Sequence, residues 1–142
     1  MLVLLIIAGI VSVFFIVQSI NRHNLPNDIP LPAAAKYVKT IEQLPQRQAD
    51  EAWLYTIASM LPAQVIDFYE AQLPGNGWEK VMRTIGGGAP GAQRSGEIVA
   101  CKMNKAVQIE ADQTSLEGVG APPGGVTLEI ILGPASEMQT CA

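Results

Sequence analysis

The first 21 residues contain no charged side chain, so all nine Lys and Arg residues and all thirteen Asp and Glu residues lie from Arg22 onward. The formal charge of −4 therefore belongs to that later part of the chain. Its basic residues are scattered singly between Arg22 and Lys105, whereas nucleic-acid binding needs a clustered positive surface. We expect no nucleic-acid partner.

Histidine is also scarce, because His23 is the only one. It has no Cys, Asp or Glu near it at metal-ligand spacing, and one ligand alone cannot hold a metal. A solvated histidine at a membrane boundary is the favoured interpretation. Serine and cysteine hydrolases need a base near the nucleophile. The sequence thus predicts no catalytic residue, no metal site and no cofactor, and we expect that the protein is not an enzyme.

The two cysteines, Cys101 and Cys141, do not form a C-x-x-C pair, which argues against redox or haem chemistry. Three alternatives remain: a disulfide between them, two buried or free thiols, and a catalytic thiol, for which no activating neighbour is visible. A disulfide would pin the C-terminal segment to the rest of the domain.

What the chain does have is a long apolar beginning. Residues 1–17 carry one hydroxyl and no charge, and residues 1–20 as a helix reach ~30 Å, enough to cross a hydrocarbon core. A cleaved signal peptide would show a basic start, a shorter apolar run and a small-residue cleavage site. We therefore predict an uncleaved transmembrane helix over residues 1–20. Ala8, Gly9 and Ser12 form a small-residue patch where a partner helix can approach closely.

Residues 21–35 contain Pro26, Pro30 and Pro32, which favour an extended chain and forbid a continuing helix. They predict a short, stiff spacer between the membrane and one small domain, residues 36–142. One domain is the usual outcome for this length.

Within this domain, residues 36–44 and 51–57 are predicted strands; the second alternates Trp53, Tyr55 and Ile57 with less apolar positions. A helix is expected from Pro62, with Ser59 as a possible cap. Its apolar stripe consists of Val65, Ile66, Tyr69 and Leu73, and it should end at residues 74–77, PGNG.

A strand opening at Trp78 and further strands over residues 97–103, 106–112 and 126–132 follow, with glycine-rich loops over residues 86–96 and 115–125. The first loop lacks the Gly-Lys-Ser/Thr of a phosphate-binding loop. Glu110, Asp112 and Glu129 fall on polar strand faces, where we expect solvent. The predicted fold class is α+β: one helix on a mostly antiparallel sheet of about five to six strands.

Residues 62–81, PAQVIDFYEAQLPGNGWEKV, resemble a small extracytoplasmic α+β domain that recurs in bacterial lipoproteins and membrane-anchored proteins. Residues 29–35, IPLPAAA, resemble the segment that precedes the first strand in those domains. The likeness covers about residues 29–132. It implies a fold and an extracytoplasmic setting, and no functional residue. The residues that match the helix-to-strand motif are Val65, Phe68, Tyr69, Leu73, Pro74, Gly77 and Trp78.

Orientation in the membrane rests on opposing signals. Arg22, Lys36 and Lys39 follow the apolar run and favour a cytoplasmic domain. The resemblance and a possible disulfide favour the periplasmic or extracellular side, which we predict.

We predict a non-catalytic, single-span accessory subunit of a larger bacterial membrane complex, with the lipid bilayer and the transmembrane helices of other subunits as its partners. Respiratory and photosynthetic electron-transfer assemblies are candidates. The alternative is a free-standing, membrane-anchored module that binds lipid, cell-wall or peptide ligands.

Overall fold

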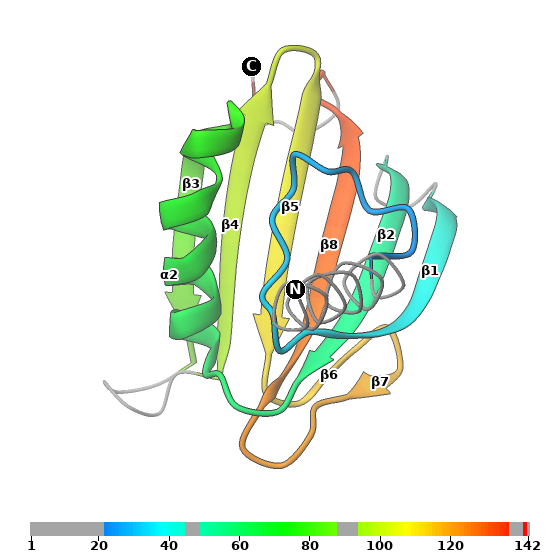
Figure 1. Ribbon diagram of the computed structural model, residues 1–142, viewed down its shortest axis with the longest axis vertical. Coiled ribbons are helices and arrows are strands. Elements are labelled where there is room, and N and C mark those ends of the chain that lie inside the picture. Colours follow the sequence, from blue (N-terminus) through cyan, green and yellow to red (C-terminus); the bar gives the residue numbers. More distant parts are fainter. Residues whose placement is uncertain (1–21, 45–48, 88–93, 137–140, 142) are drawn as a thin grey trace, which may run out of the picture.

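The structure is a computed structural model that describes residues 22–44, 49–87, 94–136 and 141 (Figure 1). Six strands form one sheet in the order β1-β2-β8-β5-β4-β3, and every neighbouring pair is antiparallel. One α-helix, α2, lies on this sheet, so the predicted α+β class is confirmed. The elements are β1 (Lys36–Leu44), β2 (Ala49–Ile57), α2 (Pro62–Gln72), the 3-10 turn η1 (Pro74–Asn76), β3 (Glu79–Gly86), β4 (Ser95–Lys102), β5 (Lys105–Asp112), β6 (Ser115–Leu116), β7 (Val119–Gly120) and β8 (Val126–Pro134).

The helix begins at Pro62, as predicted, but its cap differs. Leu61 is the N-cap residue, and its backbone N–H donates to the side-chain oxygen of Gln64 at 2.8 Å. Ser59 does not serve as the cap. After Gln72 the chain tightens into η1 and leaves it through Gly77, whose φ of 82° is left-handed. Glycine adopts this conformation without steric cost, which explains the sharp stop.

The apolar stripe of α2 packs on the sheet above β3, β4 and β5 (Figure 1). Val65, Ile66 and Tyr69 are fully buried there. Close approach depends on Gly96 in β4, because a Cβ atom at this position would lie 2.7 Å from the Cγ1 atom of Ile66. The helix therefore covers one side of the sheet, which we call the helix face.

The helix is too short to cover all of this face, and residues 22–35, which we call the strap, cover the rest. The strap crosses in front of β5, β8 and β2 in Figure 1. Its apolar side chains Leu25, Ile29 and Ala35 have 3%, 0% and 1% of their surfaces exposed, and they belong to the same core as α2. The prediction of an extended spacer is wrong for these residues, because burial of their apolar side chains outweighs the extended preference of three prolines.

The opposite side of the sheet, the hairpin face, carries the two-stranded ribbon β6–β7. The Thr127 hydroxyl donates to Val119 O at 3.0 Å, and Lys39 Nζ donates to Glu117 O at 2.7 Å, so the ribbon spans β8, β2 and β1. Residues 115–125 were predicted to be a loop. Instead they include the short hairpin β6–β7, which is hydrogen-bonded to the sheet through Thr127 and Lys39.

This arrangement corrects the prediction for Glu129. Its side chain was expected on a solvated strand surface, and it is fully buried, as is Thr127. Both residues lie on β8, which has neighbours on both sides, and the ribbon lies on their face. Strand alternation indicates which face a residue occupies, but it carries no information about a later segment that covers that face.

The predicted transmembrane helix, residues 1–20, lies outside the described residues, as do Ala8, Gly9 and Ser12. Across the part of the chain that the structure does describe, none of the helices is both long and apolar enough to cross a bilayer.

Candidate functional site: the strap junction

The strap begins on the sheet. Tyr55 donates its hydroxyl to Arg22 O at 3.1 Å, and the indole N–H of Trp53 donates to His23 O at 3.2 Å. The His23 ring stacks on Tyr37, with centroids 3.5 Å apart and planes 12° apart. Three aromatic side chains from β1 and β2 thus fix the two residues that follow the apolar run. His23 is an exposed residue, and the described residues contain no cluster of ligands able to hold a metal.

The Arg22 side chain binds carbonyl groups further along the strap. Its Nη2 atom donates to Pro26 O at 2.6 Å and to Ile29 O at 2.8 Å, which folds the strap into two consecutive turns. The Nε atom is buried and has no hydrogen-bond acceptor, and among the described residues no carboxylate pairs with this guanidinium. Arg22 is therefore a half-buried cation that, in the described part of the chain, meets carbonyl oxygens and no carboxylate.

Two buried tyrosines lie close to this cation. Burial raises the pKa of Tyr69 well above its usual range; Tyr55 adds to the rise, and the positive charge of Arg22 opposes it. The pKa of Tyr55 is raised for the same main reason, again against the charge of Arg22. The Tyr69 hydroxyl is fully buried and has no hydrogen-bond partner within the described residues. Both phenols stay neutral across the physiological range, so they cannot neutralise Arg22.

A polar hollow of about 400 Å³ opens beside this cation. It is lined by Arg22, Asn24, Leu25, Pro26 and Asn27, and both asparagine side chains are exposed. His23 and Asn24 have left-handed φ angles of 42° and 66°, which residues other than glycine rarely adopt. The hollow thus combines a cation with two amide groups on a tightly turned backbone.

The middle of the strap is held by a second cluster. Lys102 Nζ lies 2.8 Å from Asp28 Oδ2 and 2.8 Å from Asn76 O, and it sits 5.7 Å from the centre of the Trp78 ring. The Trp78 indole N–H donates to Asp28 O at 3.0 Å. The strap, η1 and the end of β4 therefore meet at Asp28. The strap is thus held at its start by β2 and in its middle by Trp78 and Lys102.

The hairpin face carries a second feature, a row of three glutamates. Glu97, Glu110 and Glu129 are direct neighbours across β4, β5 and β8. Gln108 donates its side-chain amide to Glu97 at 2.7 Å and to Glu110 at 2.6 Å. Burial, followed by the charge of Glu110, raises the pKa of Glu97, whereas the Gln108 hydrogen bond opposes the rise.

This row borders a shallow hollow of about 210 Å³ between β4, β5 and the ribbon. Its lining includes Ser95, Glu97, Glu110, Asp112 and Leu116. Glu110 and Asp112 are partly exposed, as expected from the sequence. The sequence analysis did not predict that they line one hollow together with Glu97. The signal existed in the register of the β4–β5 hairpin, since the tight turn after Lys102 sets Glu97 opposite Glu110.

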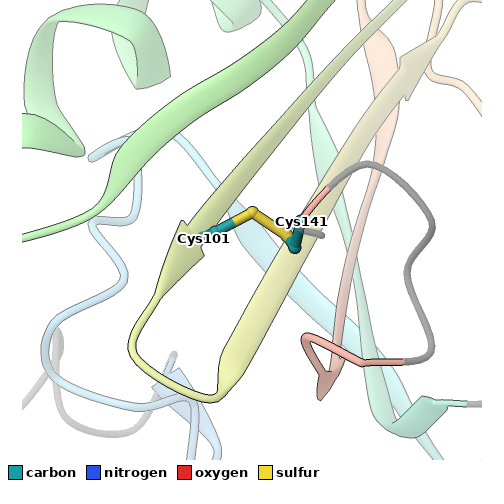
Figure 2. Close-up of a disulfide and its surroundings, with 2 residues drawn as sticks. All are labelled: Cys101 and Cys141. Atoms are coloured by element: carbon teal, nitrogen blue, oxygen red, sulfur yellow. A yellow bond between two sulfur atoms is a disulfide. The ribbon is translucent and has the colours of Figure 1, made fainter.

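The two cysteines are brought together. A disulfide joins Cys101, on the hairpin face of β4, to Cys141, with Cα atoms 5.8 Å apart (Figure 2). Of the alternatives left open by the sequence, the structure has the disulfide, and it ties the C-terminal segment to the end of β4.

Comparison with known proteins adds no relative: no family model, no curated protein and no solved structure matches the chain.

Proposed function

We propose that the chain is a single-span, non-catalytic accessory subunit of a larger membrane protein complex, with its domain held directly against the bilayer surface. The observation that carries the proposal is the position of the strap. After the apolar run of residues 1–20 and Asn21 come Arg22 and His23, whose carbonyl groups accept hydrogen bonds from Tyr55 and Trp53, respectively. A membrane helix over residues 1–20 would leave almost no free chain before the sheet.

A short connection of this kind fixes how a domain stands on a membrane. A domain on a long spacer samples many orientations, whereas one joined within a residue or two presents the same face to its neighbours. Such a fixed orientation suits a subunit that occupies one place in an assembly. Respiratory and photosynthetic electron-transfer complexes are the assemblies that we propose to examine first.

The disulfide supports a domain on the periplasmic or extracellular side. Disulfides persist in oxidising compartments and are rare in the cytosol. The test is reaction with a membrane-impermeant thiol reagent after mild reduction of intact cells. Labelling of Cys101 and Cys141 in intact cells is the expected result. Labelling only after the cells are broken would contradict an outward domain.

The accessory role is tested by extraction in mild detergent followed by native gel electrophoresis. The wild-type chain should resist carbonate washing and migrate with a large assembly. Gly9→Leu with Ser12→Leu should keep the chain in the membrane and abolish comigration, because bulky side chains prevent close helix approach at the small-residue patch. Val11→Leu is the matched control and should behave as wild type. A wild-type band at the monomer position would refute the subunit.

One observation favours a second function, a free-standing binding module. The hollow beside Glu110 is open to solvent and has both hydroxyl and carboxylate groups in its lining. A module of this kind would be retained by membranes after carbonate washing but would migrate alone in the native gel. The same experiment therefore separates the two functions.

A further inference from the structure

The surroundings of Arg22 differ from those of the three cations that form ion pairs within the described residues. Lys80, Arg83 and Lys102 each contact an acidic side chain. Arg22 is half-buried, always charged and without such a partner among the described residues. A desolvated cation is costly unless an opposite charge reaches it, so the site favours an anion.

Hydrogen-bond donors in the hollow agree with this charge. Arg22 lines the hollow; its Nη2 atom donates to Pro26 O and Ile29 O, and its buried Nε–H has no acceptor among the described residues. Asn24 and Asn27 each supply a side-chain amide with two N–H donors. A tetrahedral oxyanion offers several acceptor oxygens, and arginine with neutral amide donors is a common way to bind phosphate.

The backbone keeps these donors together at a cost. The left-handed φ angles at His23 and Asn24 lie in a region that residues other than glycine rarely adopt, although asparagine tolerates it better than most. The Trp53, Tyr55 and Tyr37 contacts hold the turn in place. Asn24 and Asn27 line the same hollow as Arg22.

We propose that this hollow binds a phosphate oxyanion through Arg22, Asn24 and Asn27, and that the headgroup of an anionic phospholipid supplies it. The phosphate chemistry follows from the donors alone. The lipid source rests on the proposed membrane tether, because the hollow begins within two residues of the apolar run, at the depth of the headgroups. A bound headgroup neutralises Arg22 and clamps the strap between the sheet and the bilayer.

The test uses the full chain in a neutral maltoside detergent at constant ionic strength, with the midpoint of thermal unfolding as the readout. Phosphatidylglycerol is titrated in one arm, a diacylglycerol without phosphate in the second, and inorganic phosphate without lipid in the third. Phosphatidylglycerol should raise the midpoint saturably, by about 4–8 °C at roughly ten times its dissociation constant. The neutral lipid should not change it.

The deciding variant is Asn24→Asp with Asn27→Asp, which keeps side-chain size and tolerance of the left-handed turn but repels an anion. It should lose the rise. Ser59→Asp with Gln72→Glu adds the same two charges at exposed positions outside the hollow and should keep the rise. An equal rise in both double variants would overturn the site.

A rise with inorganic phosphate and none with phosphatidylglycerol would overturn the lipid source and leave a free phosphate as the ligand. Carbonate washing of native membranes reports on the tether independently of these titrations. A chain that washes off but still responds to phosphate refutes the membrane function and retains the anion site. A chain that stays in the membrane but is stabilised by neither phosphatidylglycerol nor inorganic phosphate refutes the anion site and retains the membrane function.

Discussion

The helix face of the sheet is closed by α2 and the strap, which bury a continuous apolar core, whereas the hairpin face is covered over β8 by a small ribbon and is partly open over β4 and β5. On the helix face, side chains are held by apolar packing and by indole and phenol hydrogen bonds to the strap. The hairpin face carries a smaller apolar cluster around Ala52 and Ile131, together with the glutamate row, Gln108 and the disulfide. Stability should therefore be concentrated on one face and sensitivity to pH and redox state on the other.

The largest effect is expected at Ile29, which lies in the strap and is fully buried. Ile29→Ala should lower the free energy of unfolding by about 2–5 kcal/mol, because it leaves a cavity under the strap. Denaturant unfolding measures this value. Val38→Ala, at an exposed position of β1, is the control and should change it by less than about 0.5 kcal/mol. Equal small effects would show that the strap is not part of the core.

Breaking the disulfide tests the hairpin face. Reduction of the wild-type chain, or Cys101→Ser with Cys141→Ser, should lower the free energy of unfolding by about 2–4 kcal/mol, because the bridge closes a loop between residues 40 positions apart. The double serine variant should not respond to reductant. If reduction leaves wild-type unfolding unchanged, the C-terminal segment contributes nothing to stability.

The close approach of α2 to β4 is tested by Gly96→Ala. The new methyl group would lie 2.7 Å from Ile66 Cγ1, so the helix must shift, at a cost of about 1–3 kcal/mol. Gly120→Ala is the matched control, since a Cβ atom there meets no other atom within 4 Å. Thermal unfolding of both variants gives the comparison. An equal destabilisation of both variants would argue against the helix contact as its cause, because replacing glycine by alanine otherwise lowers the entropy of the unfolded chain and favours folding.

The smallest effect is a pH dependence on the hairpin face. Burial and Glu110 raise the pKa of Glu97 above its ordinary value of 4.5, so the folded state holds this proton more tightly than the unfolded state does. Its contribution to stability is present below pH 4.5 and is lost as the pH rises through the folded pKa. Glu97→Gln should remove this loss and raise stability at pH 7 by about 0.2–1 kcal/mol, as expected for relief of a like-charge cross-strand pair.

Denaturant unfolding of wild type and Glu97→Gln between pH 4 and pH 8 measures this slope. Glu79→Gln, at an exposed position of β3, serves as the control and should leave it unchanged. If the free energy of unfolding rises with pH by the same amount in wild type, Glu97→Gln and Glu79→Gln, the Glu97 charge is not destabilising.

Local signals in the sequence were enough for the elements of the sheet and for α2. Alternation identified β2, β5 and β8, and Pro62 and residues 74–77 marked the ends of the helix region. The strap was missed because its prolines favour an extended chain, while only tertiary contacts with Trp53 and Trp78 reveal its burial. The row from Glu97 to Glu129 depends on β8 pairing with β5, a long-range choice that no local pattern encodes.

The insertion of β8 between β2 and β5 also governs when the domain can form. Until residues from Val126 onward are available, the β1–β2 hairpin and the β3–β4–β5 meander share no strand ladder, and the apolar sides of both are exposed. Most pairings of β8 span large separations along the chain, so closure is slow and follows synthesis. Before β8 pairs, the nascent domain therefore consists of two unjoined half-sheets with exposed strand edges, and such edges are open to wrong pairing.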